Sequence, residues 1–189
     1  VMSWTAVYAI QQFNRSAAEI GLQFGALVTV LGIAGPLIAG PFSDWTNKRY
    51  RGGRLYVTLG ALTISPFLAF GVFNAQTIGA FYAWFVFYSL VLTMWLPPVY
   101  AALMDLVLPR MRGMVMSYYI LMMTITGMGL GPYAVGMMSD INGGRLGQAI
   151  LDLYWIGPVI ATLLVVLIWR MPKDEVSLID RARAAGEPV

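Results

Sequence analysis

The sequence predicts an all-α membrane protein, a bundle of five full membrane spans and the end of a further helix. Of its 189 residues 59% are hydrophobic and only 11% are charged, whereas soluble domains carry about 25% charged residues. The charged residues gather in short clusters and leave residues 20–43, 55–104, 114–139 and 153–169 free of charge. About 20 helical residues cross a hydrocarbon core about 30 Å thick, so these stretches have spanning length.

The elements follow from these stretches in chain order. Residues 1–13 are apolar but too short to span, so we expect the end of a helix that begins earlier. The next helix is predicted over residues 18–43. The stretch over 55–104 would measure about 75 Å as one helix, so it must fold back. Its turn-prone segment at 74–79 predicts spans over 55–73 and 78–105, and Pro97 and Pro98 predict a kink in the second. Two more spans are predicted over 112–138 and 150–170.

The distribution of basic residues predicts the orientation. If the spans alternate, ten of the 12 Lys and Arg residues fall on one side and only Arg15 and Arg145 on the other. The positive-inside rule makes the first side cytoplasmic. We therefore expect a multi-pass protein of the inner or plasma membrane, with residues 1–171 forming the bundle and residues 172–189 a cytoplasmic tail. Because the chain begins within a helix, we interpret it as the C-terminal part of a longer protein.

The residue types that are missing exclude several functions. The chain has no His and no Cys, which excludes Ser-His-Asp and Cys-His nucleophiles and metal sites built from thiolates or imidazoles. We therefore expect no enzyme, no metal and no cofactor. The pI of about 9.3 comes from basic residues that border apolar stretches, the pattern of membrane loops, so we expect no nucleic-acid partner.

An internal repeat links two of the predicted spans. Gly35-Pro36-x-x-x-Gly40-x-x-Ser43-Asp44 recurs 96 residues later as Gly131-Pro132-x-x-x-Gly136-x-x-Ser139-Asp140. By the predicted topology the two copies end on opposite sides of the membrane. This is the pattern of an inverted repeat of three helices plus three, which is typical of secondary transporters. Five residues of the repeat are expected to act as points where the helices bend: Gly35, Pro36, Gly131, Pro132 and Gly136. The alternative is that they serve only static helix packing.

The segment from Gly40 to Arg49 resembles a known loop signature. In the major facilitator superfamily it reads G-x-x-x-D-[RK]-x-G-[RK]-[RK], between the second and third helices of each half. Gly40, Asp44, Lys48 and Arg49 match, whereas Trp45 and Asn47 depart. The resemblance implies the C-terminal six-helix half of a twelve-helix transporter, whose partner is the N-terminal half of the same protein. Residues 44–54 and 108–113 are also similar to spinster-like members, which implies an amphiphilic or lipid-like substrate.

A gate is predicted at the end of the signature. Asp44 is expected to cap the helix that begins near residues 111–114, with Arg110 or Arg112 adding charge, and so to latch the cytoplasmic side. The alternative is a solvated acid that serves only topology. Asp140 is its counterpart on the other side, with Arg145 as its one candidate partner.

Substrate contacts are expected from the helices that line the cavity in the superfamily. Their polar or aromatic residues near mid-depth are Gln11, Gln23, Tyr88, Thr93, Trp95, Tyr119 and Thr124. The apolar and aromatic walls favour a small amphiphilic or organic solute. The sequence thus predicts a secondary transporter that works by alternating access with proton coupling, and the coupling acid lies in the N-terminal half, because no ionisable residue lies near the centre of a span. The alternative is a transport-inactive receptor or scaffold on the same fold.

Overall fold

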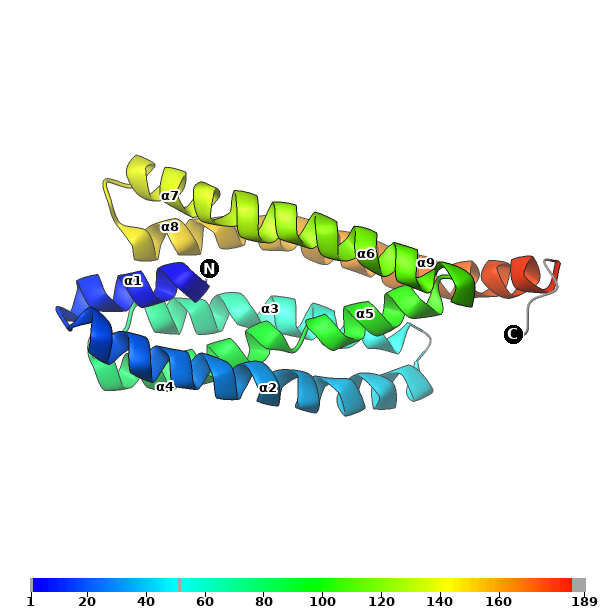
Figure 1. Ribbon diagram of the computed structural model, residues 1–189, viewed down its shortest axis with the longest axis horizontal. Helices are drawn as coiled ribbons and strands as arrows, with labels where there is room; N and C mark the ends of the chain where they lie inside the picture. Colours follow the sequence, from blue (N-terminus) through cyan, green and yellow to red (C-terminus); the bar gives the residue numbers. More distant parts are fainter. Residues whose placement is uncertain (1, 51, 185–189) are drawn as a thin grey trace.

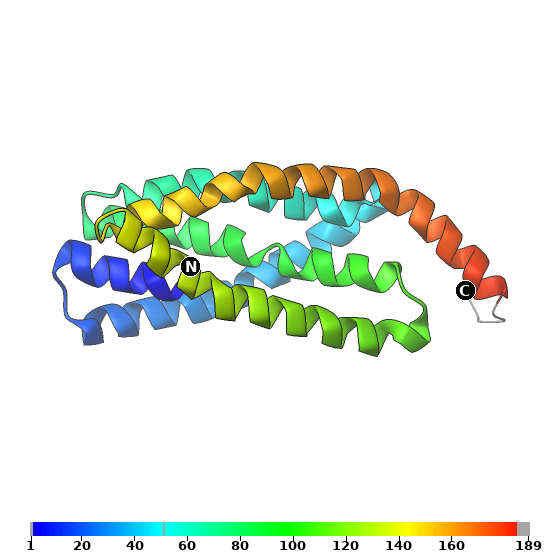
Figure 2. The same ribbon diagram turned by 90° about the horizontal axis from the view of Figure 1, so that it is seen from above.

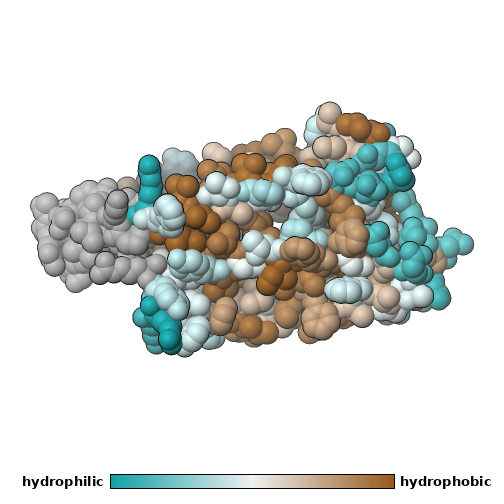
Figure 3. All heavy atoms as spheres, turned by 180° about the vertical axis from the view of Figure 1, so that it is seen from behind, coloured by the Kyte–Doolittle hydropathy of each residue, from teal (hydrophilic) through white to brown (hydrophobic). Residues whose placement is uncertain are grey.

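The computed structural model describes residues 2–50 and 52–184, with side chains described over residues 4–50 and 52–171. These parts form helices and no strand. Five stretches are long and apolar enough to cross a membrane, at residues 17–49, 53–73, 78–105, 109–141 and 146–171. The all-α membrane fold is therefore confirmed. Figure 3 shows its surface counterpart, a hydrophobic band with hydrophilic residues gathered at both ends.

The helices run lengthwise and alternate in direction (Figure 1). α2 (Ala17–Arg49) and α4 (Ile78–Thr93) form one side of the bundle, next to α1 (Met2–Phe13), α3 (Gly53–Phe73) and α5 (Leu96–Asp105). The opposite side holds two long runs of helix. The first consists of α6 (Arg112–Met123), a π-helical segment (Thr124–Leu130) and α7 (Gly131–Ile141), and the second consists of α8 (Leu146–Leu153), a short 3-10 turn and α9 (Gly157–Ala184).

The two ends of the bundle differ in charge. One end of the bundle holds the last turns of α2 and α5 and the first turns of α3 and α6. It carries a set of basic residues: Lys48, Arg49, Arg54, Arg110 and Arg112. We call this the arginine-rich end, and the other the opposite end. α9 continues beyond the bundle at the arginine-rich end as far as Ala184 (Figure 1). The predicted tail at 172–189 is thus helical through Ala184, and its last five residues lie outside the described ones.

α2 is longer than the sequence predicts, and the signature lies on it. Ser16 caps its start by accepting a hydrogen bond from the backbone N–H of Glu19 at 3.2 Å. The helix continues past residue 43 to Arg49, and both Pro36 and Pro41 lie within it. The expected long loop from residue 44 to 54 is therefore wrong. The chain turns sharply instead, with Gly52 in the left-handed region at φ 70°, where a side chain would be strained.

Two spans are interrupted by proline. The predicted kink is confirmed as a break at Met94 and Trp95, between α4 and α5. Pro97 and Pro98 have no N–H, so the carbonyl groups one turn earlier lose their helical donors. In the later span the backbone widens to a π-helix over Thr124–Leu130, just before Pro132. Single-turn π-helices of this kind are frequent at functional sites.

Aromatic packing forms the core near the opposite end. Phe24 and Phe85 lie 4.5 Å apart between ring centroids, and Phe81 stacks on Phe85 at 5.9 Å. The Tyr8 hydroxyl donates to the Phe73 carbonyl at 2.8 Å. Because lipid is as apolar as these side chains, close packing and hydrogen bonds, rather than the hydrophobic effect, hold the helices together.

Candidate functional site

A cluster of three charged residues joins three helices at the arginine-rich end. Arg54, in the first turn of α3, lies between Asp44 on α2 and Asp105 at the end of α5. Its Nη2 is 3.5 Å from Asp44 Oδ1, and its Nε is 3.3 Å from Asp105 Oδ2. We call these residues the Arg54 cluster. Because one guanidinium contacts two carboxylates, any separation of α3 from α2 or α5 breaks an ion pair.

The two ion pairs differ in exposure to solvent. The side chains of Arg54 and Asp105 are 21% and 31% exposed, whereas that of Asp44 is 60% exposed. An exposed pair contributes about 0–1 kcal/mol, so lower exposure favours the Arg54–Asp105 pair. The two side chains attract by charge alone, because the buried Arg54 Nε makes no hydrogen bond with the described residues. Buried apolar side chains pack next to this pair, including Leu55 and Ala102. Charge and packing thus both join the helices at the arginine-rich end.

The structure gives Asp44 a partner that the sequence analysis did not name. Its ion pair is with Arg54, whereas the prediction named Arg110 or Arg112. Arg110 and Arg112 are both exposed, in the turn before α6 and at its start. Lys48 and Arg49 are exposed in the last turn of α2. Gly52 was the available signal, since a glycine suits a tight turn and such a turn places Arg54 within reach of the end of α2.

The two copies of the repeat share a burial pattern. Ser43 and Ser139 are buried, and the adjacent Asp44 and Asp140 are exposed. α2 and α7 end at opposite ends of the bundle (Figure 1), which is the arrangement that an inverted repeat requires.

The repeat glycines differ in how closely they are packed. A Cβ on Gly35 would overlap the Thr93 hydroxyl and lie 2.9 Å from the Leu90 carbonyl oxygen, so Gly35 lets α2 approach α4. Gly40 and Gly136 have no described atom within 4 Å of that position, and Gly131 has only the Thr126 carbonyl, at 3.9 Å. Close packing thus accounts for Gly35, and bending stays a prediction for the others and for Pro36 and Pro132.

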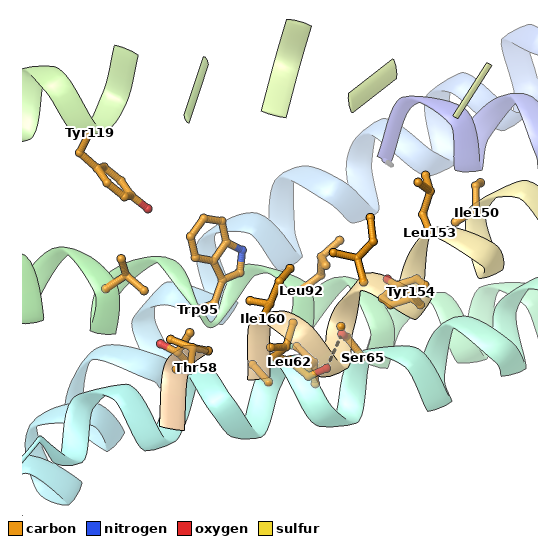
Figure 4. Close-up of a pocket in the computed structure, with 16 residues that line it drawn as sticks. Thr58, Leu62, Ser65, Leu92, Trp95, Tyr119, Ile150, Leu153, Tyr154 and Ile160 are labelled. Atoms are coloured by element: carbon orange, nitrogen blue, oxygen red, sulfur yellow. Dashed lines mark hydrogen bonds between the residues drawn. The ribbon is translucent and has the colours of Figure 1, made fainter. Parts of the chain in front are cut away.

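An apolar cavity lies inside the bundle. Its volume is about 530 Å³, and its lining comes from α3, the α4–α5 break, α6, α8 and α9. Thr58, Leu62 and Ser65 of α3 form one side, Trp95 stands at the helix break, and Tyr119 reaches toward it from α6 (Figure 4). None of the described residues that line it is charged. Seen from above, α6 and α9 lie apart, with α5 visible between them (Figure 2).

Two of the seven predicted substrate residues, Trp95 and Tyr119, line this cavity. Tyr88 lies in the core, where its hydroxyl is hydrogen-bonded to that of Tyr154 at 2.8 Å. The Thr93 hydroxyl lies in the contact between α2 and α4, within 3.3 Å of the Leu31 carbonyl oxygen. The remaining three are exposed: Gln11 lines a polar pocket at the opposite end, Gln23 lies on α2, and Thr124 begins the π-helical segment.

Comparison with known proteins identifies the class to which this helical membrane bundle belongs. The sequence profile of the Major Facilitator Superfamily matches residues 1–187. The chain therefore belongs to this superfamily of membrane transporters, as the signature at Gly40–Arg49 indicated.

A curated relative carries a more particular description. The chain is 27% identical over 157 residues to an MFS-type efflux pump of Mycolicibacterium smegmatis, and the match covers 79% of this chain and 36% of that protein. The chain thus matches about a third of the relative's length. No solved structure gave a significant match.

Proposed function

We propose that this chain is the C-terminal half of a secondary transporter that moves a small amphiphilic or organic solute across the membrane by alternating access. The observation that carries the proposal is the Arg54 cluster, because it ties α2, α3 and α5 together at the end of the superfamily signature. Such a contact stabilises the state that is closed at this end and breaks when the end opens. The relative described as an efflux pump supports export as the direction.

The surface of the bundle supports a partner half. In the stretch at 109–141, none of the residues in its most apolar window is buried within the described chain. Large side chains such as Tyr118, Met122 and Leu130 are exposed there. A site between two halves needs a wall of this kind, and we propose that the N-terminal half of the same protein faces it. The repeat supports an inverted three-plus-three architecture for this half.

Charge supports the orientation and the location of proton coupling. The excess of Lys and Arg at the arginine-rich end favours the cytoplasmic side of the inner or plasma membrane for that end. The acidic residues Glu19, Asp44, Asp105, Asp140 and Asp152 lie toward the ends of the described spans. Intramembrane carboxylates mark proton routes, so we place the coupling acid in the N-terminal half.

The test is solute and proton flux in proteoliposomes that hold the full-length protein under an imposed pH gradient. The panel comprises lysolipids, sphingoid bases, organic acids and hydrophobic cations. We expect one class to cross and to move protons with it. Transport of a labelled compound without proton movement would contradict proton coupling. If no class of compound is transported, the result would favour the alternative, a transport-inactive receptor or scaffold.

The gate is tested in the same assay with Asp44→Ala. We expect reduced flux with normal membrane insertion, because the variant removes one arm of the Arg54 cluster. Glu19→Ala is the matched control, since it breaks an exposed ion pair with Arg15 at the opposite end and should leave flux unchanged. Equal flux in wild type and Asp44→Ala would contradict the gate.

A further inference from the structure

The apolar cavity beside Trp95 has the size and composition of a ligand site. At about 530 Å³ it falls in the range of 300–1,000 Å³ typical of small-molecule pockets. It runs along α3 from Thr58 to Ser65, which is about 10 Å at 1.5 Å per residue. Thr58, Ala61 and Ser65 share one face of α3, and because they are small they leave room beside the helix. The space is thus long enough for a hydrocarbon chain or two fused rings.

The cavity is held open by aromatic contacts and by the break in the helix. Tyr119 packs edge-to-face against Tyr100, with ring centroids 5.3 Å apart, and this contact spaces α6 from α5. Trp95 stands where α4 ends and α5 begins. Figure 4 shows its indole ring within the space, with the Tyr119 hydroxyl directed toward it. In transporters, discontinuous helices mark binding sites.

The hydroxyls of the lining indicate where a ligand's polar group would lie. Those of Ser65 and Tyr154 are hydrogen-bonded within the bundle. The Thr58 Oγ1 has no hydrogen-bond partner among the described residues, but it is closed off from the cavity, so a ligand does not reach it. The Tyr119 hydroxyl is directed into the space (Figure 4). Tyr119 is therefore the lining residue placed to bind one hydroxyl or carbonyl group.

We infer that this cavity binds an uncharged hydrophobic molecule, whose hydrocarbon part lies along α3 and whose single hydroxyl or carbonyl group meets the Tyr119 hydroxyl. A charged ligand is disfavoured, because the lining offers no counter-charge and burying an unpaired charge is expensive. The described lining of the site comes from this chain alone. A role of this cavity in transport rests on the proposed function, whereas the binding of a ligand in the cavity does not depend on it.

The test uses the full-length protein in lipid nanodiscs and dodecanol that carries a photoreactive diazirine. We expect saturable labelling of residues 58–65, 95–99 and 157–164, displaced by plain dodecanol. Dodecyltrimethylammonium, with the same chain and a permanent charge, should compete at least tenfold less well. Labelling that does not saturate, or equal competition by the cation, would overturn the proposal.

Two glycines give a matched pair of variants. Gly157 lines the cavity and Gly60 of α3 does not, and neither has a described atom within 4 Å of the position of a Cβ. Gly157→Leu should fill the space and reduce labelling at least fivefold, and Gly60→Leu should change it less than twofold. Tyr119→Phe keeps the shape and should remove the preference for dodecanol over dodecane, about fivefold. Equal labelling of the two glycine variants would refute the site.

Two further measurements separate the source of the ligand and the role of the site. A phosphatidylcholine with a diazirine on its acyl chain is the second probe. Labelling by both probes identifies bilayer chains as a natural occupant, and labelling by dodecanol alone identifies a free solute. Labelling without flux of any solute would contradict the proposed function and leave the site standing, whereas flux without labelling would contradict the site alone.

Discussion

The Arg54–Asp105 ion pair should contribute more to stability than the Arg54–Asp44 pair, although the same guanidinium makes both. The distances are alike, at 3.3 and 3.5 Å, so the difference must come from solvent. At 3.3 Å and an effective dielectric constant of about 20, the gross attraction is about 5 kcal/mol. Desolvation and the side-chain entropy of ordering offset most of it. We expect a net coupling of about 1–2 kcal/mol for the pair with Asp105, and below about 1 kcal/mol for Asp44, which is 60% exposed.

Two double-mutant cycles on the full-length protein measure these couplings. One combines Arg54→Gln with Asp105→Asn, and the other combines Arg54→Gln with Asp44→Asn. The free energy of unfolding is followed by SDS titration in mixed micelles, and each coupling is the departure of the double variant from the sum of the single ones. The Arg15–Glu19 pair, exposed at the opposite end, supplies a third cycle, for which we expect about 0.3–0.5 kcal/mol. Equal couplings for the two Arg54 pairs would refute the reasoning from exposure.

Three further outcomes are expected. Gly35→Ala should lower the free energy of unfolding by about 1–3 kcal/mol, because its Cβ would overlap α4, and Gly32→Ala, on the same helix with open space, should not; equal thermal stability of the two would contradict this. Tyr88→Phe should cost about 1 kcal/mol in SDS unfolding, since it removes the hydrogen bond between the Tyr88 and Tyr154 hydroxyls, and no loss would show that the bond contributes nothing. In a cysteine-free protein, an Asn74→Cys variant should react with an impermeant thiol reagent from outside and Asn47→Cys should not, and the reverse would overturn the orientation.

Most of the helical architecture was predictable because it depends on local properties. The charge-free stretches mark the spans, since the thickness of a bilayer sets the length of an apolar helix. Pro97 and Pro98 mark the break, because a proline removes its own helical hydrogen bond wherever it lies. The end of α2 was mispredicted, since residues 44–49 are polar but remain helical. Hydropathy shows where a helix leaves the apolar layer, and not where it ends.

The candidate site was predicted in part. Trp95 and Tyr119 were named from their depth in the membrane, and both line the cavity. Tyr88 and Thr93 have similar depth, but their side chains lie in the core and in a helix contact. Depth along a helix does not determine the direction in which a side chain points, because that depends on how the helix is rotated against its neighbours.

The sequence by itself determined the class of protein, the number of the spans, the break at two prolines and the charge difference between the two ends. Each of these depends on composition or on residues close in the chain. Only the tertiary structure decided that Arg54 holds Asp44 and Asp105 together, that Gly35 lies against α4, and that a cavity opens beside Thr58. Most of these contacts join helices that are distant in the chain, as with Arg54 and Asp105, which lie 51 positions apart. Short-range forces create them only after the helices have packed.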